Sequence, residues 1–167
     1  MNHRLRSATN VLSLLVRRGE TVSVAESLTA GLIGAALTAP PGASAAFVGG
    51  VISYATELKH RLLEVPTGLL EREGAVHPQV AAAMADGVRG LTGSTYGLAV
   101  TGVAGPDPQD GKPVGTVHLA VSGPDGRVWH RDLHLAGTRE EIREWTVNEA
   151  VDLLEGLLEA SVREHSG

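Results

Sequence analysis

The spacing of apolar residues changes period several times along the chain, and each change marks the end of a predicted element. From Ala8 to Val16, apolar side chains recur with the period of about 3.6 residues that a helix requires. Short valine-rich runs then alternate with further helical stretches. In order, the pattern predicts a helix that ends at Gly19, a strand at 21–25, a helix at 27–38, a strand at 47–53, a helix at 55–64, an irregular connector containing Pro66 and Gly68, a helix from Pro78 and a strand at 96–101.

The last third of the chain predicts a loop rich in glycine and proline, then a hairpin and a final helix. Two stretches, 116–122 and 128–135, alternate between apolar and polar residues and flank a glycine-containing turn, which is typical of a hairpin. Thr138 and Glu141 have the spacing of a capping box at the start of the last helix. Helices alternating with strands, together with one hairpin, predict a three-layer α/β/α domain on a mixed sheet.

Composition mainly excludes classes of function. The chain has 167 residues, which predicts one domain spanning residues 1–167. Its net charge is −5 and only 3% of its residues are aromatic, so a nucleic-acid partner is not expected. The absence of cysteine excludes thiol nucleophiles and thiolate metal sites, and fits a reducing, cytoplasmic location. No apolar stretch approaches the ~18 residues of a membrane span, so no membrane partner is expected either.

The first candidate for chemistry is Ser27, which follows a predicted strand. In open α/β sheets, ligands bind beyond the carboxyl ends of the strands. A serine at this position is either an exposed nucleophile or simply the N-cap of the following helix. Backbone N–H groups near the start of that helix would stabilise an oxyanion.

A serine nucleophile needs a base, and the best candidate lies after the next predicted strand. Tyr54 and Lys59 stand there, five positions apart in the segment 54–59. Burial would lower the pKa of the lysine enough for it to accept a proton. The alternative is a solvated lysine near a helix start, beside a half-buried tyrosine.

The glycine-rich segment from Thr101 to Thr116 is a third candidate. Its glycines allow backbone N–H groups to approach an anion such as phosphate, although the segment matches neither a Walker A loop nor a dinucleotide fingerprint. Arg139, in the first turn of the last helix, is a further candidate for holding phosphate, because a cation there opposes the helix dipole. The alternatives are an ordinary long loop and an exposed arginine.

Alternating histidines raise the question of a metal. His130, Asp132 and His134 could face one side of a strand, with His118 on the neighbouring strand. A solvated strand face explains the same pattern. His77, directly before Pro78, is most simply a surface residue at a helix start.

Several of these segments, taken together and in chain order, resemble one known family. They are Ala25-Glu26-Ser27-x-Thr29-x-Gly31, Pro41-Gly42-Ala43-Ser44, Gly49-Gly50-Val51-Ile52-Ser53-Tyr54 with Lys59, Gly74-Ala75-Val76, Thr101-Gly102-x-Ala104-Gly105-Pro106 and Lys112-Pro113-Val114-Gly115-Thr116-Val117. From about residue 8 to 160, the chain is similar to the CinA C-terminal domain family, which includes the bacterial nicotinamide-nucleotide amidases of the PncC type.

The resemblance implies a three-layer α/β/α sandwich on a mixed, mostly parallel five-stranded sheet. It also implies hydrolysis of the carboxamide of nicotinamide mononucleotide to nicotinate mononucleotide and ammonia, with no cofactor and no metal. Ser27 would be the nucleophile and Lys59 the base, with Tyr54 linking Lys59 to the leaving ammonia. The implied substrate-binding residues are Glu26, Thr29, Ala30, Gly31, Thr101, Gly102, Gly105 and Arg139. The expected partners are a pyridine nucleotide and further copies of the chain, most simply as a dimer.

The sequence departs from the family pattern near the implied site. Leu28 and Ala30 replace a cysteine and a glycine after the serine, and Ala55 and Thr56 replace a serine and an asparagine after the tyrosine. These changes leave the implied catalytic groups intact but bear on substrate preference and turnover. A second reading is therefore a non-catalytic, nucleotide-binding regulatory module that uses the same pocket.

Overall fold

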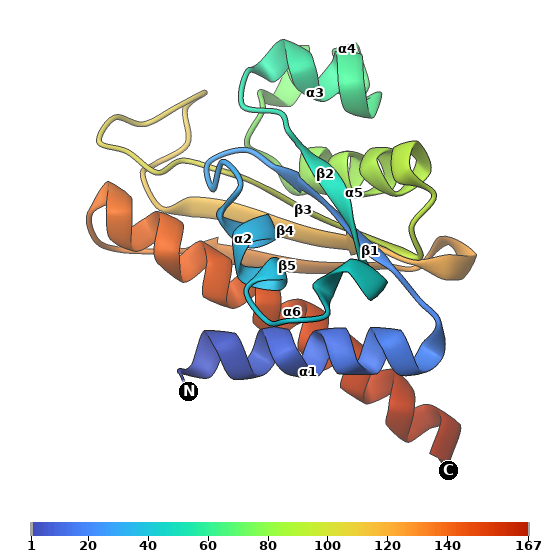
Figure 1. Ribbon diagram of the computed structural model, residues 1–167. Helices are drawn as coiled ribbons and strands as arrows, with labels where there is room; N and C mark the ends of the chain where they lie inside the picture. The colour runs from blue at the N-terminus through green and yellow to red at the C-terminus, as the bar shows by residue number, and fades with distance from the viewer. Residues whose placement is uncertain (1, 167) are drawn as a thin grey trace.

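A computed structural model describes residues 2–166, with the backbone alone for residues 165 and 166. Helices and strands alternate through most of the chain (Figure 1). The elements are α1 (His3–Arg18), β1 (Val22–Glu26), α2 (Leu32–Thr38), η1 (Ala43–Ala45), β2 (Phe47–Ile52), α3 (Thr56–Leu63), α4 (Thr67–Glu73), α5 (Pro78–Thr92), β3 (Tyr96–Gly102), β4 (Thr116–Ser122), η2 (Pro124–Gly126), β5 (Val128–His134) and α6 (Arg139–Ser166).

The strands form one mixed sheet in the order β2-β1-β3-β4-β5, which confirms the predicted fold class. β1 pairs in parallel with both β2 and β3, whereas β3–β4 and β4–β5 are antiparallel. Four of the five strands therefore run in the same direction, and β4 runs against them. The predicted hairpin is β4–β5.

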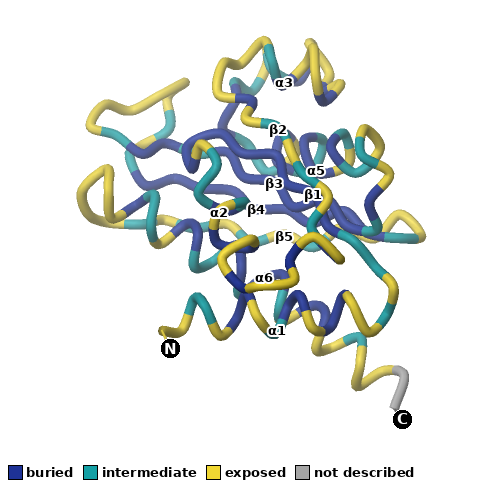
Figure 2. Tube along the Cα trace, viewed as in Figure 1, coloured by how far each residue is buried: buried dark blue, intermediate teal, exposed yellow. Residues whose placement is uncertain are grey.

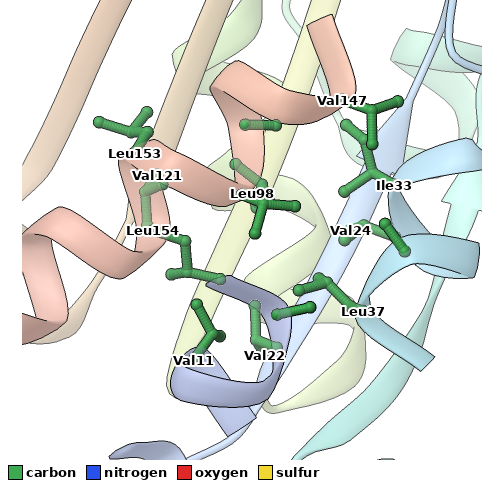
Figure 3. Packing of buried hydrophobic residues seen from close by; sticks show 14 of the residues in the cluster. Val11, Val22, Val24, Ile33, Leu37, Leu98, Val121, Val147, Leu153 and Leu154 are labelled. Carbon is green, nitrogen blue, oxygen red and sulfur yellow. The ribbon is translucent and has the colours of Figure 1, made fainter. Parts of the chain in front are cut away.

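Helices cover both faces of the sheet and create two apolar layers. α1, α2 and α6 pack on one face, where Val22, Leu98 and Leu154 belong to the larger core cluster (Figure 3). α5 and the ends of α3 and α4 pack on the other face around Met84 and Ala99. The middle strands β1, β3 and β4 are almost wholly buried, whereas the edge strands β2 and β5 alternate between more and less exposed residues (Figure 2).

Two of the predicted helix ends are confirmed by their capping geometry. Gly19 ends α1 in the left-handed conformation, with φ of 65°. Thr138 and Glu141 exchange the two hydrogen bonds of a capping box, at 3.0 and 3.1 Å. α6 therefore begins directly after Thr138, at Arg139.

Two predictions of local structure are wrong. The helix expected from Ser27 begins only at Leu32, because residues 28–31 form a turn in which Ala30 and Gly31 have positive φ. The connector after Pro66 is the short helix α4, whose Leu69 is buried in the smaller core cluster. Burial of Leu69 against α5 stabilises this short helix. Pro66, directly before the helix, and Gly68, within it, are the reason that the sequence did not predict it.

Candidate active site

Ser27 and Lys59 meet beyond the carboxyl end of the sheet. Ser27 directly follows β1, and Lys59 lies on α3, which follows the neighbouring parallel strand β2. Lys59 Nζ lies 2.9 Å from Ser27 Oγ. Ser27 is 8% exposed and Lys59 only 1% exposed. A buried lysine in contact with a serine is the arrangement that general-base activation of a hydroxyl requires.

Two backbone carbonyls fix the orientation of the Lys59 amine. Lys59 Nζ donates to the Ser53 carbonyl oxygen at 2.7 Å and to the Tyr54 carbonyl oxygen at 3.3 Å. Carbonyl oxygens only accept hydrogen bonds, so both must receive N–H groups from the amine. A neutral amine has two N–H groups and one lone pair. When both N–H groups bond the carbonyls, the lone pair is left facing the Ser27 hydroxyl.

Burial also changes the proton affinity of this amine. Desolvation lowers the pKa of Lys59 to about 8, against a smaller opposing effect from the negative charge of Asp110. At pH 7 roughly a tenth of the protein then carries neutral Lys59, and this fraction rises steeply up to pH 8 and beyond. A neutral base is thus available near physiological pH.

Glu26, predicted to bind substrate, instead supports the turn that carries Ser27. It is 1% exposed, and its carboxylate accepts hydrogen bonds from Thr29 Oγ1 at 2.6 Å, Ile33 N at 2.9 Å and Gly34 N at 3.0 Å. Both oxygens accept hydrogen bonds from within the protein, and Glu26 is not among the residues that line the cavity described below. Glu26 therefore caps α2 from the preceding strand and closes the turn around Ser27.

Replacing Glu26 by glutamine is expected to destabilise the protein by about 2–4 kcal/mol, because an amide NH₂ would face a backbone N–H donor in a buried site. Urea unfolding measures this loss, with Glu57→Gln on the exposed start of α3 as the matched control. An unfolding free energy for Glu26→Gln equal to that of the control would contradict the capping role.

Ser27 opens into a cavity of about 260 Å³ between the turn after β1 and the loop after β3. Its lining is Ser27, Leu28, Tyr54, Ala55, Thr56, Gly102, Val103, Ala104, Gly105, Asp107, Gln109 and Arg139. A larger groove of about 770 Å³ lies between α3 and α5, and its lining includes the carboxylates Glu64 and Asp86 but no hydroxyl or amine that pairs a nucleophile with a base. The smaller cavity is therefore the candidate active site.

Arg139 and Tyr54 form one wall of this cavity. The Arg139 guanidinium donates to the Gly105 carbonyl oxygen at 2.6 Å and to the Tyr54 hydroxyl at 3.3 Å. The predicted link between the Tyr54 hydroxyl and Lys59 is not the contact that forms, since Lys59 bonds the backbone oxygen of Tyr54. Tyr54 is 58% exposed, so its ring stands at the mouth of the cavity.

The other predicted substrate-binding residues divide into two groups. Gly102 and Gly105 line the cavity, where they can contact a ligand. Thr29, Ala30, Gly31 and Thr101 do not line it. Thr101 is buried and donates to the Ala75 carbonyl oxygen at 2.7 Å, and Ala30 is exposed, so the extra methyl of Ala30 does not narrow the cavity.

Several residues at the site carried no recognisable signal in the sequence. Asp107 and Gln109 line the cavity from a loop whose folding depends on distant contacts. Arg143 donates to the Leu28 carbonyl oxygen at 2.8 Å and so ties α6 to the turn after Ser27. Its position one helical turn after Arg139 could have suggested that both arginines face the same way.

One histidine of the β4–β5 hairpin, His118, pairs with an aspartate on the neighbouring strand. His118 Nδ1 lies 2.6 Å from Asp132 Oδ1, and His130, Asp132 and His134 are exposed on β5. Among the side chains of residues 2–164, no group of three or more histidine, aspartate or glutamate residues is placed to hold a metal ion. His77 accepts from Gln79 N at 3.1 Å and caps α5.

No helix in the described part of the chain is both long and apolar enough to cross a membrane.

Comparison with known proteins places the chain in one family. The sequence model of the CinA C-terminal domain matches residues 5–158. A CinA-like protein of Frankia casuarinae is 57% identical over 148 residues, which are 89% of this chain and 34% of that protein. A CinA-like protein of Parasynechococcus marenigrum is 60% identical over 120 residues, or 71% of this chain and 29% of that protein. The chain thus spans about a third of the length of these relatives.

Solved structures share the whole fold. The competence/damage inducible protein CihA from Agrobacterium tumefaciens superposes with a TM-score of 0.90 at 37% identity, covering 94% of this chain and 96% of that one. A CinA-superfamily protein from Klebsiella pneumoniae gives a TM-score of 0.90 at 29% identity, covering 95% and 99% of the two chains.

Proposed function

Because this chain belongs to the CinA C-terminal domain family, we propose that it is an amidohydrolase that converts nicotinamide mononucleotide to nicotinate mononucleotide and ammonia. The observation that carries the proposal is the buried Lys59 amine, 2.9 Å from Ser27 Oγ and held by two carbonyls. A serine beside a lysine whose pKa is lowered to about 8 is equipped to attack an amide carbon.

Acylation begins with transfer of the Ser27 proton to neutral Lys59 as Oγ bonds the amide carbon. The N–H groups at the start of α2 are bonded to Glu26, so they do not hold the oxyanion as the sequence suggested. We assign that role to the N–H group of Leu28, the first after the nucleophile and part of the cavity wall. The tetrahedral intermediate then breaks its C–N bond, and Lys59 returns the proton to the departing nitrogen as ammonia.

Deacylation reverses the roles with water in place of ammonia. Lys59, neutral again, takes a proton from water as the oxygen attacks the acyl carbon. The bond to Ser27 Oγ breaks, and Lys59 returns the proton to Oγ. The products are the free carboxylic acid and the original serine, and the protein supplies every proton transfer.

The remaining walls of the cavity suit the nucleotide part of the substrate. Arg139 provides a cation at the mouth, which we assign to the phosphate, and the loop carrying Gly102 and Gly105 borders the space for the ribose. A volume of about 260 Å³ is near the lower end of ligand pockets, which favours a mononucleotide over a dinucleotide.

The test is to incubate the purified protein with nicotinamide mononucleotide and measure ammonia and nicotinate mononucleotide, with and without a chelator. Equal and stoichiometric release of both products, unaffected by the chelator, is the expected result. Nucleotide binding without release would instead support a regulatory module, and would direct attention to Leu28, Ala55 and Thr56, which line the cavity where the sequence departs from the family.

A further inference from the structure

The loop between β3 and β4 contains a tight turn that projects beyond the sheet (Figure 1). Gln109 and Lys112 exchange backbone hydrogen bonds of 3.1 and 2.8 Å, and Asp110 and Gly111 between them have φ of 51° and 74°. Two successive positive φ values are characteristic of the type I′ turn, for which Asp-Gly is a preferred pair. The turn is therefore built locally, and Gln109, at its base, lines the cavity.

This turn is fastened to the segment that joins α4 and α5. Asp110 Oδ2 accepts from Ala75 N at 3.0 Å, and Lys112 Nζ donates to the Val76 carbonyl oxygen at 2.9 Å. Gly74 permits the approach, since a Cβ at Gly74 would lie 2.7 Å from the Cβ of Asp110. An acidic and a basic side chain, two residues apart, thus bond opposite polar groups of one short segment.

We propose that Asp110 is a positioning residue of the active site, whose carboxylate fastens the cavity loop onto the Gly74–Val76 segment and so sets the place of Asp107 and Gln109 against the substrate. The inference rests on the proposed function, because it concerns how the same cavity receives its substrate. Loops whose polar groups are bonded to a buried segment move less, and Ala75 and Val76, which receive these bonds, are 2% and 1% exposed.

The same carboxylate acts on the base through its charge. Asp110 raises the pKa of Lys59, against the larger lowering by burial. The groups that contact the amine itself, the Ser27 hydroxyl and two carbonyls, are uncharged. Glu57, His60 and Arg61 share α3 with Lys59 but do not contribute to this shift. Neutralising Asp110 should therefore lower the pKa of Lys59 further.

Two variants separate the hydrogen bond of Asp110 to Ala75 N from the effect of the Asp110 charge on Lys59. Asp110→Asn keeps an oxygen for Ala75 N and tolerates the positive φ, but removes the charge. Asp110→Gly removes both without the backbone strain that alanine would bring at φ of 51°. Glu71→Gln, exposed on α4, controls for one unit of net charge.

We expect Asp110→Gly to raise KM for nicotinamide mononucleotide about tenfold, the effect of one lost hydrogen bond, while Asp110→Asn leaves KM near that of the unaltered protein. In both variants the acid limb of the kcat/KM profile moves to lower pH, and in Glu71→Gln it does not move. A purely structural role would lower the melting temperature and leave both readouts unchanged, which would overturn the proposal, as would equal KM values for the two Asp110 variants.

Hydrogen exchange at the Ala75 amide tests the fastening without any assay of activity. Protection should be lost in Asp110→Gly and kept in Asp110→Asn. If the unaltered protein fails to hydrolyse the nucleotide, the proposed function fails while this measurement still tests the fastening. Equal Ala75 protection in all variants would show that the fastening is absent.

Discussion

Ser27→Ala is expected to abolish the release of ammonia from nicotinamide mononucleotide, with a fall in kcat on the order of 10⁴-fold or more. Removing Oγ removes the atom that would form the proposed acyl-enzyme, and no other hydroxyl of the described side chains bonds the Lys59 amine. Nucleotide binding should survive, because Arg139 and the loop after β3 are unchanged. Ammonia release and calorimetric titration with the nucleotide measure the two effects separately.

Ser23→Ala is the matched control for this variant. Ser23 lies on the same strand, is 0% exposed and bonds Ser94 Oγ at 2.8 Å, away from the cavity. It should lose some stability and keep its turnover. If Ser27→Ala retained a tenth of the activity, or if both serine variants lost it equally, the nucleophile would have to be another group.

The meeting of Ser27 and Lys59 could be anticipated from sequence because both residues follow strands. Carboxyl ends of neighbouring parallel strands share one edge of a sheet, so residues after β1 and β2 come together once those strands pair. The alternative interpretation, that Ser27 is the N-cap of the following helix, is wrong for a local reason. The capping oxygens come from Glu26, whose side chain reaches the N–H groups of residues 33 and 34.

Other parts of the site depend on contacts that no spacing in the sequence reveals. Asp110 reaches Ala75, 35 positions away, through a turn whose docking is decided by Gly74. The resemblance to the family implied that Tyr54 links Lys59 to the leaving ammonia. The side chain instead meets Arg139, which α6 brings to the same rim from 85 positions away.

Lys59→Met is expected to remove activity as completely as the serine variant, while changing stability in the opposite sense from most core substitutions. Methionine fills a similar volume but cannot accept a proton, so the acylation step loses its base. In the unaltered protein the folded-state pKa of Lys59 is about 8, below the ordinary value of 10.5. Below pH 8, folding therefore buries an ammonium ion at a cost of about 3 kcal/mol.

Because of this cost, the stability of the unaltered protein should depend on pH in a definite direction, and Lys59→Met should lack that dependence. Between pH 8 and 10.5 the unfolded chain binds more protons at this position than the folded chain, so stability rises with pH. Urea unfolding at pH 7 and pH 10.5 should show a gain of about 3 kcal/mol in the unaltered protein relative to Lys59→Met. Lys112→Met removes the other lysine of the chain, retains Lys59 and should keep the rise.

The activity and the pH dependence of stability must be measured together on Lys59→Met, because neither result identifies the base alone. Loss of activity alone would follow from any damage to the cavity, and a flat stability profile alone would follow from any change in the burial of Lys59. Loss of activity with stability at pH 7 equal to or above that of the unaltered protein requires a buried lysine retained for its chemistry. An active Lys59→Met protein, or one that keeps the rise between pH 8 and 10.5, would show that Lys59 is not the base.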